Sequence, residues 1–128
     1  MEITRSTAGY AETTARLVRA IEGRRLAVFA RLDHAAGARE AGLELEPEEV
    51  VVFGDPRAGT PLMQRDRRVG LDLPLRMLVW QDGDEVMLGY RDPRELADVY
   101  DLGPERETLD RMFGLLGALA ADAAGTAA

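Results

Sequence analysis

The sequence predicts an α+β domain: a mixed, mainly antiparallel sheet with helices packed on one face. Three observations predict this class. Apolar residues recur every three or four positions near both ends of the chain, as in helices that pack on one side. Segments between these alternate apolar and polar residues, as strands do. The Asp82-Gly83 pair indicates a late hairpin, which a purely parallel sheet lacks, so the expected order is β-α-β-α-β-α-β-β-α-α.

The first half of the chain alternates predicted strands and helices. Residues 2–7 suit a short strand, and the apolar spacing of Tyr10–Glu22 predicts the first helix. Arg25–Asp33 alternates with a period of two, which predicts a strand buried on one face, and Ala35–Ala41 follows as a short helix. Val50–Phe53 is continuously apolar, so a central strand buried on both faces is expected there.

The second half begins with a third helix, for which Thr60 is the expected N-cap and Pro61 the first helical residue. Later helices are expected over residues 92–101 and up to about Ala120. The last residues of the chain have nothing to bury. A single domain over 1–120 with a mobile tail at 121–128 is therefore expected.

Between these helices lies the predicted hairpin. Its strands are expected at Leu75–Gln81 and Glu85–Arg91, joined by the Asp82-Gly83 turn. Trp80 and Tyr90 occupy alternating positions, which predicts that the two rings share a face across the hairpin.

Composition excludes several classes of chemistry. The chain has 128 residues, no cysteine and no lysine, so disulfides, thiol nucleophiles and Schiff bases are ruled out. The single serine, Ser6, and the single histidine, His34, lack the surroundings of a catalytic triad. A net charge of −7 and arginines interleaved with acids argue against nucleic-acid binding. No apolar run is long enough for a membrane span and no secretion signal is evident, so a cytoplasmic location is expected.

Three segments, taken together, carry a resemblance to a known family. These are Asp33-His34-Ala35, the run from Phe53 to Met63 (FGDPRAGTPLM), and Asp72-Leu73-Pro74-Leu75. The chain resembles the domain of unknown function 302 family, although Asp55 stands where the family commonly has asparagine. The resemblance implies a compact α+β fold that is dimeric, and it implies no established reaction.

His34 is the sharpest candidate for a functional residue. Beside Asp33 at the end of a strand, it could act as a general acid or base that Asp33 orients. It could also be an axial haem ligand, with Met63 as a second soft ligand. A third interpretation is structural, with both ring nitrogens bonded to backbone groups. With one histidine and no cysteine, a protein-only zinc site is not expected.

The Gly54–Thr60 turn is the second candidate. Its glycines have the spacing of a phosphate-binding loop, but the lysine of that motif is missing. A weaker prediction is that Gly59 and Thr60 form an anion site at a helix start and that Arg57 clamps the anion. The alternative is a capped turn without a ligand.

The function favoured by the sequence is that of a homodimeric protein that binds a small ligand near Asp33-His34 and the Gly54–Thr60 turn. A haem protein, an enzyme that uses His34, and a structural or protein-interaction module are the alternatives. The sequence does not choose a ligand or a substrate.

Overall fold

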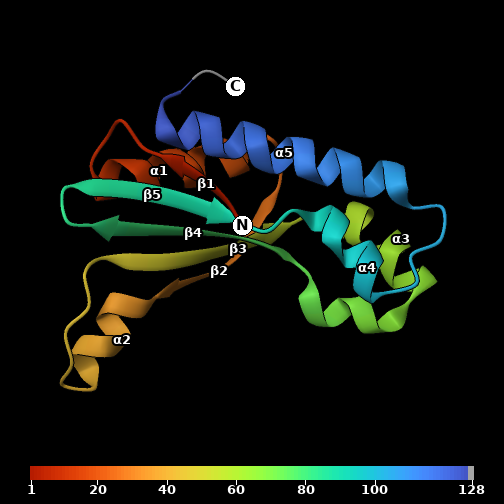
Figure 1. Cartoon of the computed structure of the whole chain (residues 1–128), viewed down its shortest axis with the longest axis horizontal. Coiled ribbons are helices and arrows are strands. Elements are labelled where there is room, and N and C mark those ends of the chain that lie inside the picture. Colours follow the sequence, from red (N-terminus) through yellow and green to blue (C-terminus); the bar gives the residue numbers. More distant parts are fainter. Residues whose placement is uncertain (127–128) are drawn as a thin grey trace.

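The structure, a computed structural model, describes residues 1–126. These residues form one five-stranded sheet in the order β1-β5-β4-β3-β2 (Figure 1). The strands are β1 (Glu2–Arg5), β2 (Ala27–Asp33), β3 (Glu48–Gly54), β4 (Leu75–Asp82) and β5 (Glu85–Tyr90). All four pairings in this sheet are antiparallel. The predicted α+β class is therefore confirmed, and the sheet is wholly antiparallel where a mixed, mainly antiparallel one was predicted.

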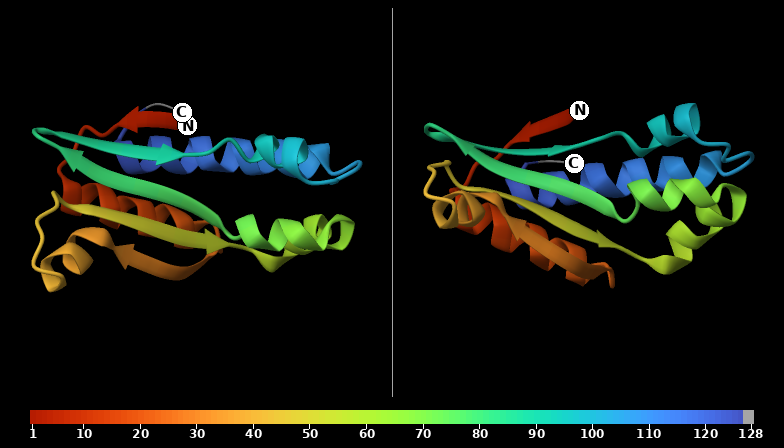
Figure 2. Two further views of the ribbon diagram at one scale, coloured as in Figure 1. Left: turned by 60° about the horizontal axis from the view of Figure 1, so that its bottom comes forward. Right: turned by 90° about the horizontal axis from the view of Figure 1, so that it is seen from below.

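The helices fall into two groups. The longer ones, α1 (Tyr10–Gly23) and α5 (Arg106–Ala124), lie side by side on one face of the sheet (Figure 2). The shorter ones lie at the two ends of the sheet. They are α2 (His34–Glu40), α3 (Pro56–Arg65), the 3-10 helices η1 (Arg67–Asp72) and η2 (Pro93–Glu95), and α4 (Leu96–Val99). The helix predicted over residues 92–101 is thus present as the short η2 and α4.

The core lies between the sheet and the α1–α5 layer. Val51 and Phe53 of β3 are fully buried against this layer, whereas Val50 and Val52 on the opposite face are only partly buried. The prediction of a strand buried on both faces was wrong, because helices cover only one face of this sheet. A second, smaller cluster of buried residues lies under α3 and η1 and includes Leu62 and Met112.

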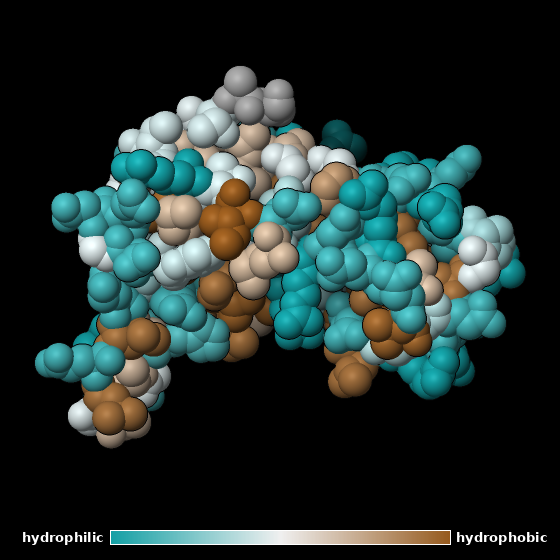
Figure 3. Space-filling view, viewed as in Figure 1, coloured by the Kyte–Doolittle hydropathy of each residue, from teal (hydrophilic) through white to brown (hydrophobic). Residues whose placement is uncertain are grey.

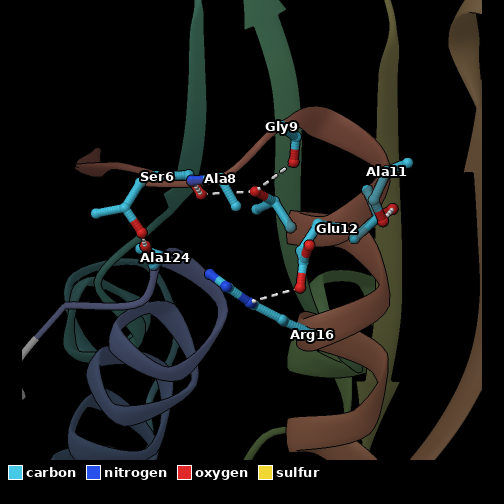
Figure 4. Close-up of polar contacts among 10 residues, drawn as sticks. Ser6, Ala8, Gly9, Ala11, Glu12, Arg16 and Ala124 are labelled. Atoms are coloured by element: carbon cyan, nitrogen blue, oxygen red, sulfur yellow. Dashed lines mark hydrogen bonds and ion pairs between the residues drawn. The ribbon is translucent and has the colours of Figure 1, made fainter.

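The expected mobile tail was also wrong for the residues that the structure describes. Helix α5 continues to Ala124, and Ala123 and Ala124 are fully buried. The backbone amide and the hydroxyl of Thr7 both donate to the Ala124 carbonyl, at 2.9 and 2.8 Å, so the β1–α1 loop holds the end of the helix (Figure 4). Residues 127–128 of the predicted tail lie outside the described residues.

A network of hydroxyl groups supports this attachment. The Ser6 and Thr13 hydroxyls are 2.6 Å apart, and Thr13 Oγ1 donates to the Gly9 carbonyl. Arg16 Nε lies 3.4 Å from Glu12 Oε1, and Arg16 Nη1 is buried with no hydrogen-bond partner among residues 1–126 (Figure 4). Small polar residues therefore fix the junction of α1, β1 and the end of α5.

The hairpin register places the two aromatic rings on opposite faces. Trp80 pairs with Met87, and Leu78 pairs with Gly89, so Tyr90 falls on the other face from Trp80. Tyr90 points to the core and is 8% exposed, whereas the Trp80 ring lies over Gly89 on the open face. The prediction that the two rings share a face was wrong.

Candidate functional site

The two predicted halves of the site lie at opposite ends of the sheet. Ala27 pairs with Gly54 and Asp33 with Glu49, so β2 enters α2 at one end and β3 enters α3 at the other (Figure 1). Seven residues of strand separate them, which is about 20 Å. Within one chain, the prediction of a single site formed by His34 and the Gly54–Thr60 turn is therefore wrong.

At the His34 end, the neighbouring aspartate already has a structural task. Asp33 Oδ1 accepts a hydrogen bond of 2.8 Å from the Ala36 amide and caps α2. His34 is the first residue of α2 and is exposed, and its ring makes no hydrogen bond within residues 1–126. Within residues 1–126, Asp33 therefore does not orient the His34 ring, and the ring nitrogens are not bonded to backbone groups as the structural interpretation predicted.

An ion pair that the sequence analysis did not identify lies beside this junction. Glu49 is 6% exposed, and its two carboxylate oxygens accept from Arg31 at 2.9 and 2.8 Å. Burial, together with the charges of Glu49 and Asp33, raises the pKa of Tyr10 from 10.0 to about 12. Tyr10 therefore stays protonated at neutral pH and is not a base. Within residues 1–126, no group of three or more histidine and carboxylate side chains is placed to hold a metal ion.

At the other end, α3 begins earlier than predicted. Asp55 is the N-cap, its Oδ1 accepts from the Arg57 amide at 2.9 Å, and Pro56 is the first helical residue. Thr60 and Pro61 lie inside the helix, so the predicted cap at Thr60 was wrong. Aspartate caps at least as well as threonine, which explains why the Asp55-Pro56 pair starts the helix first.

This capping also removes the predicted anion site. The Asp55 carboxylate occupies the helix start, and hydrogen bonds from the Arg57 backbone and side chain lower its pKa below the usual value. A second anion would meet this negative charge. The Arg57 side chain is 85% exposed and extends to Asp55, with Nε 3.2 Å from Oδ1. Arg57 is therefore not a clamp on the turn.

An apolar cavity of about 210 Å³ lies behind the same turn. Thr60 and Met63 of α3 form one wall, Leu73-Pro74-Leu75 another, and Met112 and Leu115 of α5 close it from the helix layer. Phe29 of β2, which is 52% exposed, stands at the outside. The cavity thus lies where the two buried clusters of the core meet.

Glycines allow the cavity walls to approach one another. A Cβ at Gly54 would lie 3.5 Å from Pro74 Cβ, and one at Gly70 would lie 3.3 Å from Met63 Sδ. Gly59 faces Leu73 and Met63 at 3.7 and 3.8 Å by the same measure. Side chains at these positions would occupy the cavity or push on its walls.

Three of the predicted site residues are thus brought together and three are not. Gly59, Thr60 and Met63 line the apolar cavity, whereas Asp33, His34 and Arg57 do not. The sequence analysis missed Phe29, Met112 and Leu115. The spacing of these residues indicates only that they pack in the core. No local sequence pattern indicates that β2, the Gly54–Thr60 turn and α5 meet at one cavity.

Comparisons with known proteins place the chain in a family context. The model of the family described as "Domain of unknown function DUF302" matches residues 2–119. A crystal structure of an uncharacterized conserved protein DUF302 from Bacillus stearothermophilus has the same fold, with a TM-score of 0.85. The alignment covers 95% of this chain and 96% of that one at 19% sequence identity.

Curated relatives come from Brucella. A protein named Fluoride-specific ion channel FluC 1 from Brucella suis is 49% identical over 94 residues. The match covers 73% of this chain and 37% of that protein. The protein named FluC 2 from Brucella melitensis matches at 49% over 35% of its length. The chain therefore spans about a third of these relatives. Among residues 1–126, no helix has the length and apolar character needed to cross a bilayer.

Proposed function

Because the chain belongs to the family named Domain of unknown function DUF302, we propose that its family-pattern segments form a binding site for a small apolar molecule. The site is the cavity of about 210 Å³ behind the Gly54–Thr60 turn. One observation carries the proposal: two segments that are distant in sequence and that both carry the family pattern contribute most of the walls. These wall residues are Gly54, Pro56, Gly59, Thr60, Met63, Leu73, Pro74 and Leu75.

The volume and chemistry of the cavity favour a ligand the size of one ring. A cavity of about 150 Å³ lined by apolar side chains is large enough for benzene, whereas pockets for larger ligands begin at about 300 Å³. The methionine side chains of Met63 and Met112 can adjust to different apolar shapes. This volume disfavours haem, and the distance of Met63 from His34 disfavours a haem bound by both residues.

Methyl NMR of the methionines provides a direct test with benzene as the probe. The chain has five methionines. Met63 and Met112 line the cavity, whereas Met77 is fully buried elsewhere in the core. We expect benzene to shift the Met63 and Met112 methyl signals in a saturable manner and to leave the Met77 signal unchanged. Shifts of equal size at all three methyls, or none at Met63 and Met112, would reject the proposal.

A matched pair of glycine variants separates binding from stability. Gly59 and Gly114 both lie inside helices, where alanine stabilises by up to about 1 kcal/mol. A Cβ at Gly59 meets the cavity wall at ordinary contact distance, and a Cβ at Gly114 has nothing within 4 Å. We expect Gly59→Ala to weaken benzene binding several-fold and Gly114→Ala to leave it unchanged, with both variants as stable as the parent or more stable.

The proposal includes a homodimer, for which the exposed β2 edge provides the support. Phe29 and Leu32 on this edge are 52% and 51% exposed, and Leu43 after α2 is 65% exposed. In the space-filling view, apolar residues lie among polar ones on the α2 projection at the lower left (Figure 3). Arg25 precedes β2 and Asp33 ends it, so antiparallel pairing of two β2 strands about a two-fold axis sets opposite charges together.

Sedimentation measurements test the dimer. We expect the parent protein to sediment as a dimer and Leu32→Glu to sediment as a monomer, because the new carboxylate would be buried next to its copy. Leu71→Glu is the control, since Leu71 is 79% exposed on η1, away from β2. A monomeric parent protein would refute the dimer without bearing on the cavity.

The names of the curated relatives favour a second candidate, a role beside fluoride transport. In this case the chain would perform, as a separate protein, the role that the matching segment has within the longer relatives. Deleting the gene in its host should then increase growth inhibition by fluoride, and expression of the chain should restore growth. Unchanged fluoride tolerance in the deletion strain would exclude this role.

A further inference from the structure

Two arginines lie just beyond the end of the β4–β5 ladder. The pairing of these strands ends at Leu78 and Gly89, and Arg76 and Arg91 each lie two residues beyond this pair. Within residues 1–126, neither guanidinium has a carboxylate within 4.0 Å. The fold therefore carries an uncompensated pair of positive charges.

Both arginines line one cavity of about 380 Å³. This volume lies within the range of small-molecule pockets, about 300–1,000 Å³. Val50, Leu78 and Leu96 give the cavity an apolar surface. Gly89 also lines it, and Met1 and the Trp80 ring pack closely against this glycine. The cavity shares only Pro74 and Leu75 with the apolar cavity described above, and Tyr90 and Leu116 of the core also line it.

The acidic residues around this cavity leave the two arginines available. Asp92 is held by Arg94 at 2.7 Å, and this pairing lowers the pKa of Asp92. Asp72 accepts the Tyr100 hydroxyl at 2.5 Å. Glu95 also lines the cavity and would repel a ligand with several negative charges. The surroundings therefore suit a single negative charge between the two guanidinium groups.

We propose that Arg76 and Arg91 bind the carboxylate of a small organic acid whose apolar body lies on Val50, Leu78 and Leu96. Neither arginine lines the apolar cavity behind the Gly54–Thr60 turn, although the two cavities share Pro74 and Leu75. Guanidinium groups bind carboxylates through paired hydrogen bonds, and the apolar surface adds affinity that an inorganic anion would lack.

Sodium benzoate is the probe, and benzyl alcohol is its uncharged counterpart. Met1 lines this cavity and Met63 lines the other, so their methyl signals report on the two sites separately. We expect benzoate to shift Met1 and the Gly89 amide, with affinity that falls as salt is raised, and to leave Met63 unchanged. Benzyl alcohol should bind at this site at least about tenfold more weakly, because a charged hydrogen bond is lost.

Arg76→Gln and Arg91→Gln should each reduce the benzoate affinity about tenfold or more. Arg19→Gln, at an exposed arginine of α1, is the matched control and should bind as the parent does. Both arginines are exposed, so each glutamine variant should leave the melting temperature nearly unchanged. The proposal is overturned if benzoate does not shift Met1, if benzyl alcohol binds equally well, or if both glutamine variants melt lower and bind benzoate unchanged. Its failure leaves the benzene result at Met63 and Met112 untouched.

Discussion

At each end of the β2–β3 pair, a strand leads directly into a helix. In both places an aspartate side chain caps the helix by accepting a hydrogen bond from a backbone amide of its first turn. Asp33 accepts from Ala36 at one end, and Asp55 accepts from Arg57 at the other. Beyond the caps the two junctions differ. Helix α3 buries Leu62 completely and encloses an apolar cavity, whereas α2 buries only Ala35.

The difference between the junctions comes from their surroundings and not from their local sequence. Met112 and Leu115 of α5 reach the α3 junction and provide an apolar wall. Near the α2 junction, the residues beside Tyr10 are charged: Arg31, Asp33 and Glu49. Identical capping chemistry thus leads to an apolar site at one end and to a polar, exposed helix at the other. Variants at each end can test this contrast.

The largest effect is expected from Leu62→Ala in α3. Leu62 is fully buried, and such truncations cost about 2–5 kcal/mol because they remove apolar contacts and leave a void. The variant should also weaken benzene binding, since α3 forms one wall of the cavity. Urea unfolding measures the loss of stability.

The matched change at the other end is Leu43→Ala. Leu43 follows α2 and is 65% exposed. Its truncation should change the free energy of unfolding of the monomer by no more than about 0.5 kcal/mol. Equal losses in the two variants would contradict the contrast between a buried and an exposed junction.

An effect between those of Leu62→Ala and Leu43→Ala is expected from Glu49→Gln at the polar end. The change replaces two charged hydrogen bonds to Arg31, and because the Arg31 side chain is 47% exposed, the cost should be only about 1–2 kcal/mol. The pKa of Tyr10, about 12 in the parent, should fall but stay above 10.0, because burial is the larger cause of the shift. The NMR signal of the Tyr10 ring reports this pKa separately from the raised pKa values of Tyr90 and Tyr100.

The raised pKa of Tyr10 also sets a pH dependence. The folded protein holds the phenol proton more tightly than the unfolded chain, whose pKa is near 10.0. The corresponding stability is complete below pH 10 and is lost as the pH rises toward 12. Glu49→Gln should narrow the pH range over which this stability is lost. An unchanged titration of the Tyr10 ring signal would show that the carboxylate does not act on Tyr10.

Much of this fold could be predicted from the sequence because short-range patterns determine it. Alternation placed Arg25–Asp33 and the hairpin strands, and helical spacing placed α1 and α5. The prediction that Trp80 and Tyr90 share a face was wrong because it depends on the pairing register of β4 and β5, which the Gly83-Asp84 turn sets. The predicted end of α5 was wrong because alanines carry no strong pattern along the chain. Their burial in the core and the hydrogen bonds from Thr7 depend on contacts between distant segments.

The candidate site was predictable only in part. The family pattern identified Gly59, Thr60 and Met63, which do line one cavity. It also joined them to His34, although β2 and β3 are antiparallel and their helices leave from opposite ends. Segments of one family pattern can therefore lie far apart in the structure. Here the seven residues of β2 separate His34 from the Gly54–Thr60 turn.

An effect as small as that of Leu43→Ala is expected from His34→Ala. His34 is exposed, and its ring has no hydrogen bond in the described part of the chain, so the free energy of unfolding should change by no more than about 0.5 kcal/mol. Benzene binding at Met63 should be unchanged, because the cavity lies at the other end of β2. Absorption titration with haem should give the same response in the parent and the variant. A Soret shift that only the parent shows would instead make His34 a ligand and would return function to the polar end of the sheet.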